Sequence, residues 1–131
     1  MATQTLFPEN VLIVEDEFML AVMLQDMVET LGVPRVSHAA TLADALDLVA
    51  QESFDFAFLD INLGKENSIP VARVLAERDT RFVFASGYDA KFDSEGVSAP
   101  LLRKPLGIDE IRAVLTASDF GTQSGRISRI G

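Results

Sequence analysis

The sequence predicts a single α/β domain in which helices cover both faces of a parallel, doubly wound sheet. Short apolar runs typical of buried strands alternate along the chain with stretches whose apolar residues recur at helical spacing. The chain has 131 residues, of which 48% are hydrophobic and 24% charged, which is typical of one globular domain. Polar residues directly follow most of the apolar runs, which predicts a functional edge at the carboxyl ends of the strands.

Five strands are predicted from apolar runs that are too short for helices. The first is a continuous apolar run, the third is rich in phenylalanine, and the fourth and fifth have the pattern of buried strands. In chain order the predicted strands are residues 11–14, 36–40, 54–59, 82–85 and 101–102.

Helices are predicted where apolar residues recur three or four positions apart. Gly32 stops the first helix, Thr41 is the predicted N-cap of the second, and Ser68 is the predicted N-cap of the third, with Pro70 in its first turn. Only a weak helical pattern lies between the last two strands, so we expect a short or mobile fourth helix there. The predicted helices are residues 18–31, 42–50, 69–76, 90–97 and 109–117.

The ends of the chain differ in composition from its middle. Residues after Asp119 are mainly Gly, Ser, Thr and Arg, with too few apolar side chains to pack. We therefore expect an N-terminal extension over residues 1–9, a folded domain over residues 10–118, and a flexible tail over residues 119–131 with no output domain.

Composition excludes several classes of protein. Without cysteine the chain has no disulfide scaffold, no thiolate zinc site and no cysteine nucleophile. The apolar run over residues 18–24 is far shorter than the roughly 20 residues of a membrane span, and no basic residue precedes it as in a signal peptide. We therefore expect a cytoplasmic protein with no insertion into a membrane.

The formal net charge of −9 comes from the first half of the chain. Residues 1–65 contain 11 acidic and 2 basic residues, whereas residues 66–131 contain 9 of each. Such a surface repels nucleic-acid phosphates and has no basic stripe, so nucleic acid is not an expected partner. Clustered carboxylates instead suggest a divalent cation.

Polar residues at four predicted strand ends form the candidate site. Glu15 and Asp16 follow the first strand, Asp60 the third, Ser86 the fourth and Lys104 the fifth. Mg²⁺ suits such carboxylates because it takes six oxygen ligands and is usually held by one or two carboxylates together with water and phosphate. A lysine and a hydroxyl beside the ion suggest phosphoryl transfer to Asp60, which would form an acyl phosphate.

These residues lie in motifs that resemble a response-regulator receiver domain over about residues 10–118. The matching motifs are Val11-Leu12-Ile13-Val14-Glu15-Asp16-Glu17, Phe58-Leu59-Asp60-Ile61-Asn62-Leu63, Ala85-Ser86-Gly87 and Arg103-Lys104-Pro105. The resemblance implies a flavodoxin-like (CheY-like) fold with five parallel strands in the order 2-1-3-4-5.

The same resemblance implies roles for individual residues. Asp60 would accept a phosphoryl group from a sensor histidine kinase or a histidine phosphotransfer protein. Glu15, Asp16, Asp60 and the backbone carbonyl of Asn62 would hold Mg²⁺. The peptide bond between Lys104 and Pro105 would be cis, and a monomer or weak dimer is expected.

A narrower resemblance is to the mostly single-domain "FAT GUY" receivers, through the segment Arg81-Phe82-Val83-Phe84-Ala85-Ser86-Gly87-Tyr88. Ser86 replaces the usual Thr of this group, and Arg81 stands where Pro is common. Leu101 occupies the position of the aromatic switch residue of ordinary receivers. We therefore hypothesise that Ser86 and Tyr88 form the switch, and the resemblance implies a place in general stress signalling.

Each of these residues also has a structural interpretation. Asp16 could be a helix N-cap, Asp60 and Ser86 could be turn residues, and Lys104 could be an exposed charge. His38, the only histidine, is interpreted as an edge residue rather than a phosphocarrier.

Three functions remain open at this point. The first is a receiver that is not an enzyme on other substrates and that signals by protein binding, relays phosphate, or acts as a phosphate sink. The second is a Mg²⁺-dependent phosphatase like the haloacid dehalogenases, but Asn62 stands where those enzymes have a general acid/base Asp. The third is a pseudo-receiver that acts only as a binding module.

Overall fold

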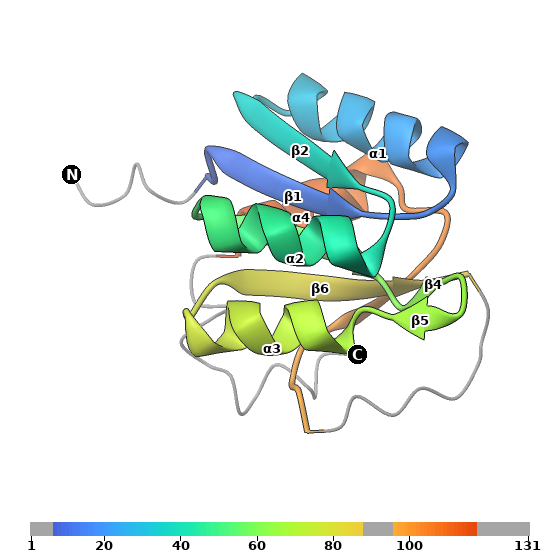
Figure 1. Ribbon diagram of the computed structural model, residues 1–131. Coiled ribbons are helices and arrows are strands. Elements are labelled where there is room, and N and C mark those ends of the chain that lie inside the picture. Colours follow the sequence, from blue (N-terminus) through green and yellow to red (C-terminus); the bar gives the residue numbers. More distant parts are fainter. Residues whose placement is uncertain (1–6, 88–95, 118–131) are drawn as a thin grey trace.

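The computed structural model describes residues 7–87 and 96–117 of the chain. Five parallel strands form one sheet in the order β2-β1-β3-β6-β7 (Figure 1). These strands are β1 (Asn10–Val14), β2 (Arg35–Ala39), β3 (Phe56–Asp60), β6 (Arg81–Ser86) and β7 (Leu101–Arg103). Numbered without the small hairpin β4–β5, this is the predicted order 2-1-3-4-5, which is confirmed.

Helices cover both faces of this sheet. On one face lie α1 (Phe18–Thr30) and α4 (Ile108–Leu115), and on the other lie α2 (Leu42–Gln51) and α3 (Ile69–Glu77) (Figure 1). Two separate clusters of buried hydrophobic side chains follow, one beneath each pair of helices. This layered arrangement is the predicted doubly wound fold.

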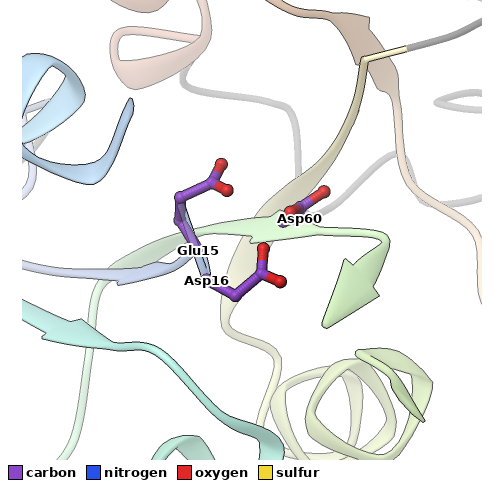
Figure 2. Close-up of side chains that lie close together, drawn as sticks. All are labelled: Glu15, Asp16 and Asp60. Carbon is purple, nitrogen blue, oxygen red and sulfur yellow. The ribbon is translucent and has the colours of Figure 1, made fainter. Parts of the chain in front are cut away.

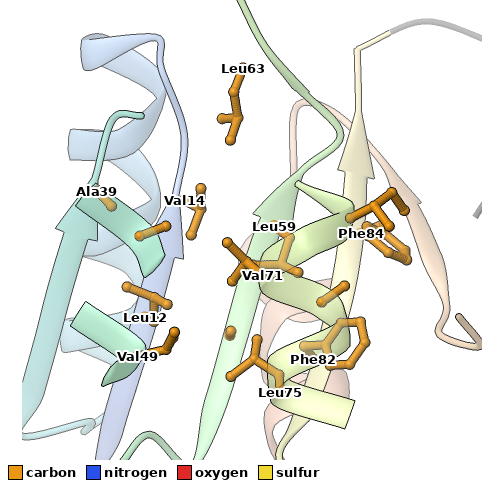
Figure 3. Close-up of a cluster of buried hydrophobic side chains, with 14 of the residues drawn as sticks. Leu12, Val14, Ala39, Val49, Leu59, Leu63, Val71, Leu75, Phe82 and Phe84 are labelled. Atoms are coloured by element: carbon orange, nitrogen blue, oxygen red, sulfur yellow. The ribbon is translucent and has the colours of Figure 1, made fainter. Parts of the chain in front are cut away.

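Every residue of the central strands β1 and β3 is buried, as their apolar runs predict. Alternate side chains of β3 enter different clusters. Phe56 and Phe58 pack with α1 and α4. Their rings meet edge to face, with 5.0 Å between the ring centroids. Leu59 packs with α2 and α3, beside Leu12 and Val14 of β1 (Figure 3). With two hydrophobic faces, β3 is held firmly up to its last residue, Asp60.

Arg81, at the start of β6, holds the end of α4. Its guanidinium donates to the carbonyl oxygens of Ala117 at 2.5 Å and Leu115 at 3.5 Å, and it lies 5.4 Å from the centre of the Phe56 ring. Burial lowers the pKa of Arg81, and the charge of Asp55 opposes that shift. A cation suits this position because the carbonyls at a helix C-terminus carry partial negative charge.

The segment between the third predicted strand and the third predicted helix contains a small antiparallel hairpin. Its strands are β4 (Asn62–Leu63) and β5 (Glu66–Asn67), joined through Gly64 and Lys65. Gly64 has a φ of 69°, which glycine adopts without steric cost. Strands of two residues are too short to produce a recognisable alternation, so the sequence pattern indicated only a loop.

The two predicted helix caps have different outcomes. Thr41 caps α2 as predicted, because its hydroxyl oxygen accepts a hydrogen bond from the backbone N–H of Asp44 at 3.1 Å. Ser68 is the N-cap residue of α3, as predicted, but its side chain makes no capping hydrogen bond. Asn67 makes the bond at this helix end instead, because its Oδ1 accepts a hydrogen bond from the backbone N–H of Ile69 at 2.9 Å. The side chain of Asn67 thus makes the bond expected from the hydroxyl of Ser68, the next residue in the chain.

Some predictions fall on residues that are not described. The expected fourth helix over residues 90–97 lies mostly outside the described residues, although residues 96–100 are described and form no helix. Tyr88, residues 1–6 and residues 118–131 also lie outside them. Within the described ranges, no helix has the length and apolar character needed to cross a membrane.

Candidate functional site

The first part of the site is the segment that joins β1 to α1. Glu15 is only 4% exposed, and its backbone N–H donates to the carbonyl oxygen of Ala39 at 3.0 Å. Its Oε2 accepts from the backbone N–H of Glu17 at 3.1 Å. Asp16 is exposed, and the N-cap of α1 is Glu17, so Asp16 is not the helix cap that its alternative interpretation required.

Asp60 meets these two carboxylates at the carboxyl edge of the sheet. It is the last residue of β3 and is 6% exposed. One carboxylate oxygen from each of Glu15, Asp16 and Asp60 lies within 4.8 Å of the others, and Figure 2 shows the three side chains converging. Hard oxygen donors at this spacing fit Mg²⁺.

Lys104 lies beside the two buried carboxylates. Its Nζ is 2.9 Å from Glu15 Oε1 and 3.3 Å from Asp60 Oδ2. Its backbone N–H donates to the carbonyl oxygen of Ser86 at 2.8 Å, and the peptide bond to Pro105 is cis, as the resemblance implied. The structural interpretation of Lys104 as an exposed charge is therefore wrong, because its side chain is only 14% exposed.

The protonation of the site reflects this crowding. Burial, and after it the charge of Glu15, raises the pKa of Asp60 to about 7, although Lys104 opposes both effects. Burial lowers the pKa of Lys104, but hydrogen bonds and charge from Glu15 and Asp60 outweigh burial, so its pKa lies above the ordinary value. Lys104 therefore stays a cation, and Asp60 without a bound metal ion loses its proton around neutral pH rather than around pH 4.

The remaining predicted site residues have different positions. Ser86 is the buried last residue of β6 and pairs in register with Arg103, which brings it next to Lys104. Asn62 is exposed and begins β4, two residues after Asp60. Tyr88, the other half of the hypothesised switch, lies outside the described residues.

One residue of the site region was missed by sequence reasoning. His38 is half-buried on β2, and its Nε2 lies 2.8 Å from the backbone carbonyl oxygen of Glu15. This contact depends on the parallel pairing of β1 with β2, in which His38 lies opposite Ile13. Strand pairing cannot be read from periodicity, so a histidine on a predicted edge strand carried no signal of its own.

The family is decided by a comparison with protein-family models. The model of the response regulator receiver domain matches residues 11–116, which includes all the site residues above. The chain belongs to this receiver family. The cluster of Glu15, Asp16, Asp60 and Lys104, at the ends of β1, β3 and β7, lies within the matched residues.

Similar proteins agree with this membership. The chain is 34% identical over 119 residues to the sensory transduction protein LytT of Bacillus cereus, which covers 87% of this chain and 48% of LytT. It therefore spans about half the length of that relative.

Several solved structures are similar to most of this chain. The solution structure of SdrG from Sphingomonas melonis Fr1 is 44% identical, with a TM-score of 0.71 over 81% of this chain and 92% of SdrG. SdrG has also been solved in a BeF3-activated conformation, with 44% identity, a TM-score of 0.68 and coverage of 82% and 92%. The receiver domain of the sensor histidine kinase PA1611 from Pseudomonas aeruginosa, solved with magnesium in its active-site cleft, has the same fold at 19% identity, with a TM-score of 0.74 over 84% and 96% of the chains.

Proposed function

We propose that Asp60 accepts a phosphoryl group from a phosphohistidine donor in a Mg²⁺-dependent reaction, and that this modification switches binding to another protein. The observation that carries the proposal is the grouping of three carboxylates within 4.8 Å of one another with the Lys104 ammonium 3.3 Å from Asp60. Three anions and one cation leave an excess of negative charge that a divalent cation neutralises. The same cation and ammonium suit an incoming phosphoryl group.

The chemical step needs little from the protein beyond orientation and charge. An oxygen of the ionised Asp60 carboxylate attacks phosphorus, the P–N bond of the phosphohistidine breaks, and the imidazole nitrogen leaves with the bonding electrons. Lys104 lies where it can pair with an oxygen of the transferred group, and the Ser86 hydroxyl would donate a hydrogen bond to another. Mg²⁺, held by Glu15, Asp16, Asp60 and the Asn62 carbonyl, would supply positive charge for the same oxygens.

An exposed apolar surface beside the site supports binding to another protein. Phe18 and Met19 of α1 are 70% and 66% exposed, and Val22 and Met23 of the next turn are also exposed. These side chains begin two residues after Asp16, so a partner that covers them would also reach the phosphorylation site. A sensor histidine kinase or a histidine phosphotransfer protein is the proposed donor.

The proposal is tested by intact mass spectrometry after incubation with acetyl phosphate. We expect a single phosphoryl adduct that requires Mg²⁺, is absent with EDTA and is lost in Asp60→Ala. Asp47→Ala, which removes an exposed carboxylate of α2, is the matched control and should still be modified. Modification of Asp60→Ala would overturn the assignment of the phosphoacceptor.

Finer parts of the prediction stay predictions. They are a regulator that catalyses only its own phosphorylation and dephosphorylation, membership of the "FAT GUY" subgroup, general stress signalling and a cytoplasmic location. A phosphate sink or relay intermediate is the alternative role. A phosphotransfer time course with the donor and a second receiver separates the two, because a relay intermediate passes its phosphoryl group on and a sink loses it to water.

A further inference from the structure

We infer that His38 is a positioning residue that fixes the backbone at Glu15 and so holds the Glu15 and Asp16 carboxylates ready for a divalent cation. This inference rests on the proposed function of the site. It concerns a half-buried side chain on β2 that does not belong to the carboxylate cluster itself.

The first observation is that all four polar positions of Glu15 have partners. Its backbone N–H donates to Ala39 at 3.0 Å, and its carbonyl oxygen accepts from His38 at 2.8 Å. Its two carboxylate oxygens accept from Lys104 Nζ at 2.9 Å and from the Glu17 backbone N–H at 3.1 Å. Two of these four bonds therefore come from neighbouring residues at the end of β2.

The direction of the bond from His38 is set by chemistry. A backbone carbonyl oxygen only accepts hydrogen bonds, so the Nε2 of His38 must carry the proton and donate. The register of β1 with β2 ends at Val14 and Ala39, and the Glu15 N–H makes one further backbone bond to Ala39. The bond from His38 adds a side-chain contact at the carbonyl oxygen of Glu15.

This support matters because the segment after β1 carries much of the site charge. Three carboxylates within 4.8 Å repel one another, and Glu17 at the N-cap of α1 makes no side-chain capping bond that would fix the turn. A cation at the site would compete with Lys104 and Glu17 for the carboxylate oxygens of Glu15. It would not compete for the two backbone bonds to β2, so His38 would support the segment with and without metal.

The experiment compares His38→Ala, His38→Gln and the wild type by two measurements. Calorimetric titration with Mg²⁺ gives the dissociation constant, and amide hydrogen exchange of metal-free protein reports on Asp16 and Glu17. We expect His38→Ala to weaken Mg²⁺ binding about fivefold and to speed exchange of these amides by a similar factor, since one hydrogen bond is lost. Gln places an N–H donor at the same distance along the side chain and should restore both to within about twofold.

The controls separate this inference from the function on which it rests. Ser37→Ala changes the half-buried neighbour of His38 on the same strand and should leave both measurements unchanged. If the wild type binds no Mg²⁺, the proposed metal site fails, while amide exchange in metal-free protein still tests His38. Unchanged exchange in His38→Ala, or equal losses in the Ala and Gln variants, would overturn the positioning role.

Discussion

At about pH 8 the metal-free Asp60→Asn variant should be more stable than the wild type, and by a clearly larger margin than at about pH 4.5. Burial and the neighbouring Glu15 raise the pKa of Asp60 from 3.8 to about 7. Between these two values the folded protein keeps a proton that the unfolded chain has released. The stability of the wild type therefore falls as the pH rises through this interval, and a neutral amide removes that loss.

The size of the effect follows from the pKa difference. A shift of roughly 3 pKa units corresponds to about 4 kcal/mol between low pH and pH well above 7. The Asp60 side chain is only 6% exposed, so solvent screens its interactions only weakly. At about pH 4.5 the wild type has already lost part of this free energy of unfolding. The stabilisation by Asp60→Asn is therefore expected to be about 3 kcal/mol larger at about pH 8 than at about pH 4.5.

Urea unfolding in EDTA measures how the stabilisation by Asp60→Asn depends on pH. The free energy of unfolding of the variant minus that of the wild type is compared at the two pH values, so groups that titrate alike in both proteins cancel. Asp47→Asn removes an equal formal charge from the exposed face of α2 and is the control, with an expected change below about 0.5 kcal/mol.

An equal stabilisation by Asp60→Asn at both pH values would refute the reasoning, because the effect would then not depend on ionisation of the carboxyl group. A destabilised variant at about pH 8 would show that the ion pair with Lys104 outweighs burial.

Three further predictions follow from the same contacts. Lys104→Ala leaves the buried carboxylates of the site without their ammonium partner, so it should destabilise the metal-free protein by about 3 kcal/mol in urea unfolding. Mg²⁺ should restore most of that stability. Equal losses with and without Mg²⁺ would contradict this prediction. Asp16→Asn should weaken Mg²⁺ binding about tenfold in calorimetry without preventing folding, since this residue is exposed, and an unaltered affinity would mean that it is not a ligand. Arg81→Ala should speed amide exchange in the last turn of α4 about tenfold, whereas Arg78→Ala, which removes a guanidinium bond to the Val49 carbonyl of α2, should not.

The core of the fold was predictable because its strands are buried on both faces. The apolar runs that form β1 and β3 are too short for a helix and too continuously apolar for a strand with one face in water. They are therefore interpreted as strands buried on both faces. Site residues at strand ends were predictable for the same reason. Once the strands are parallel, Glu15, Asp60 and Lys104 must meet at one edge.

Features that depend on pairing or on single side-chain contacts were less predictable. His38 contacts Glu15 only because β2 lies beside β1, and apolar periodicity carries no information about strand order. Ser68 and Asn67 are both good capping residues, and it is Asn67, the last residue of the β4–β5 hairpin, whose side chain accepts from the Ile69 N–H. Arg81 stood out only as a departure from the motif, because its carbonyl partners lie more than thirty positions later in the chain.

The hairpin β4–β5 has a consequence for protein engineering. Side chains alternate between the two faces along β3, so one residue inserted into that strand would turn Asp60 away from Glu15 and bury a charge under α2 and α3. A residue inserted between Gly64 and Lys65 meets no such constraint, because both lie exposed at the hairpin tip outside the five-stranded sheet. A short reporter sequence grafted at that tip would lie a few residues from Asp60 and leave the register of the sheet intact.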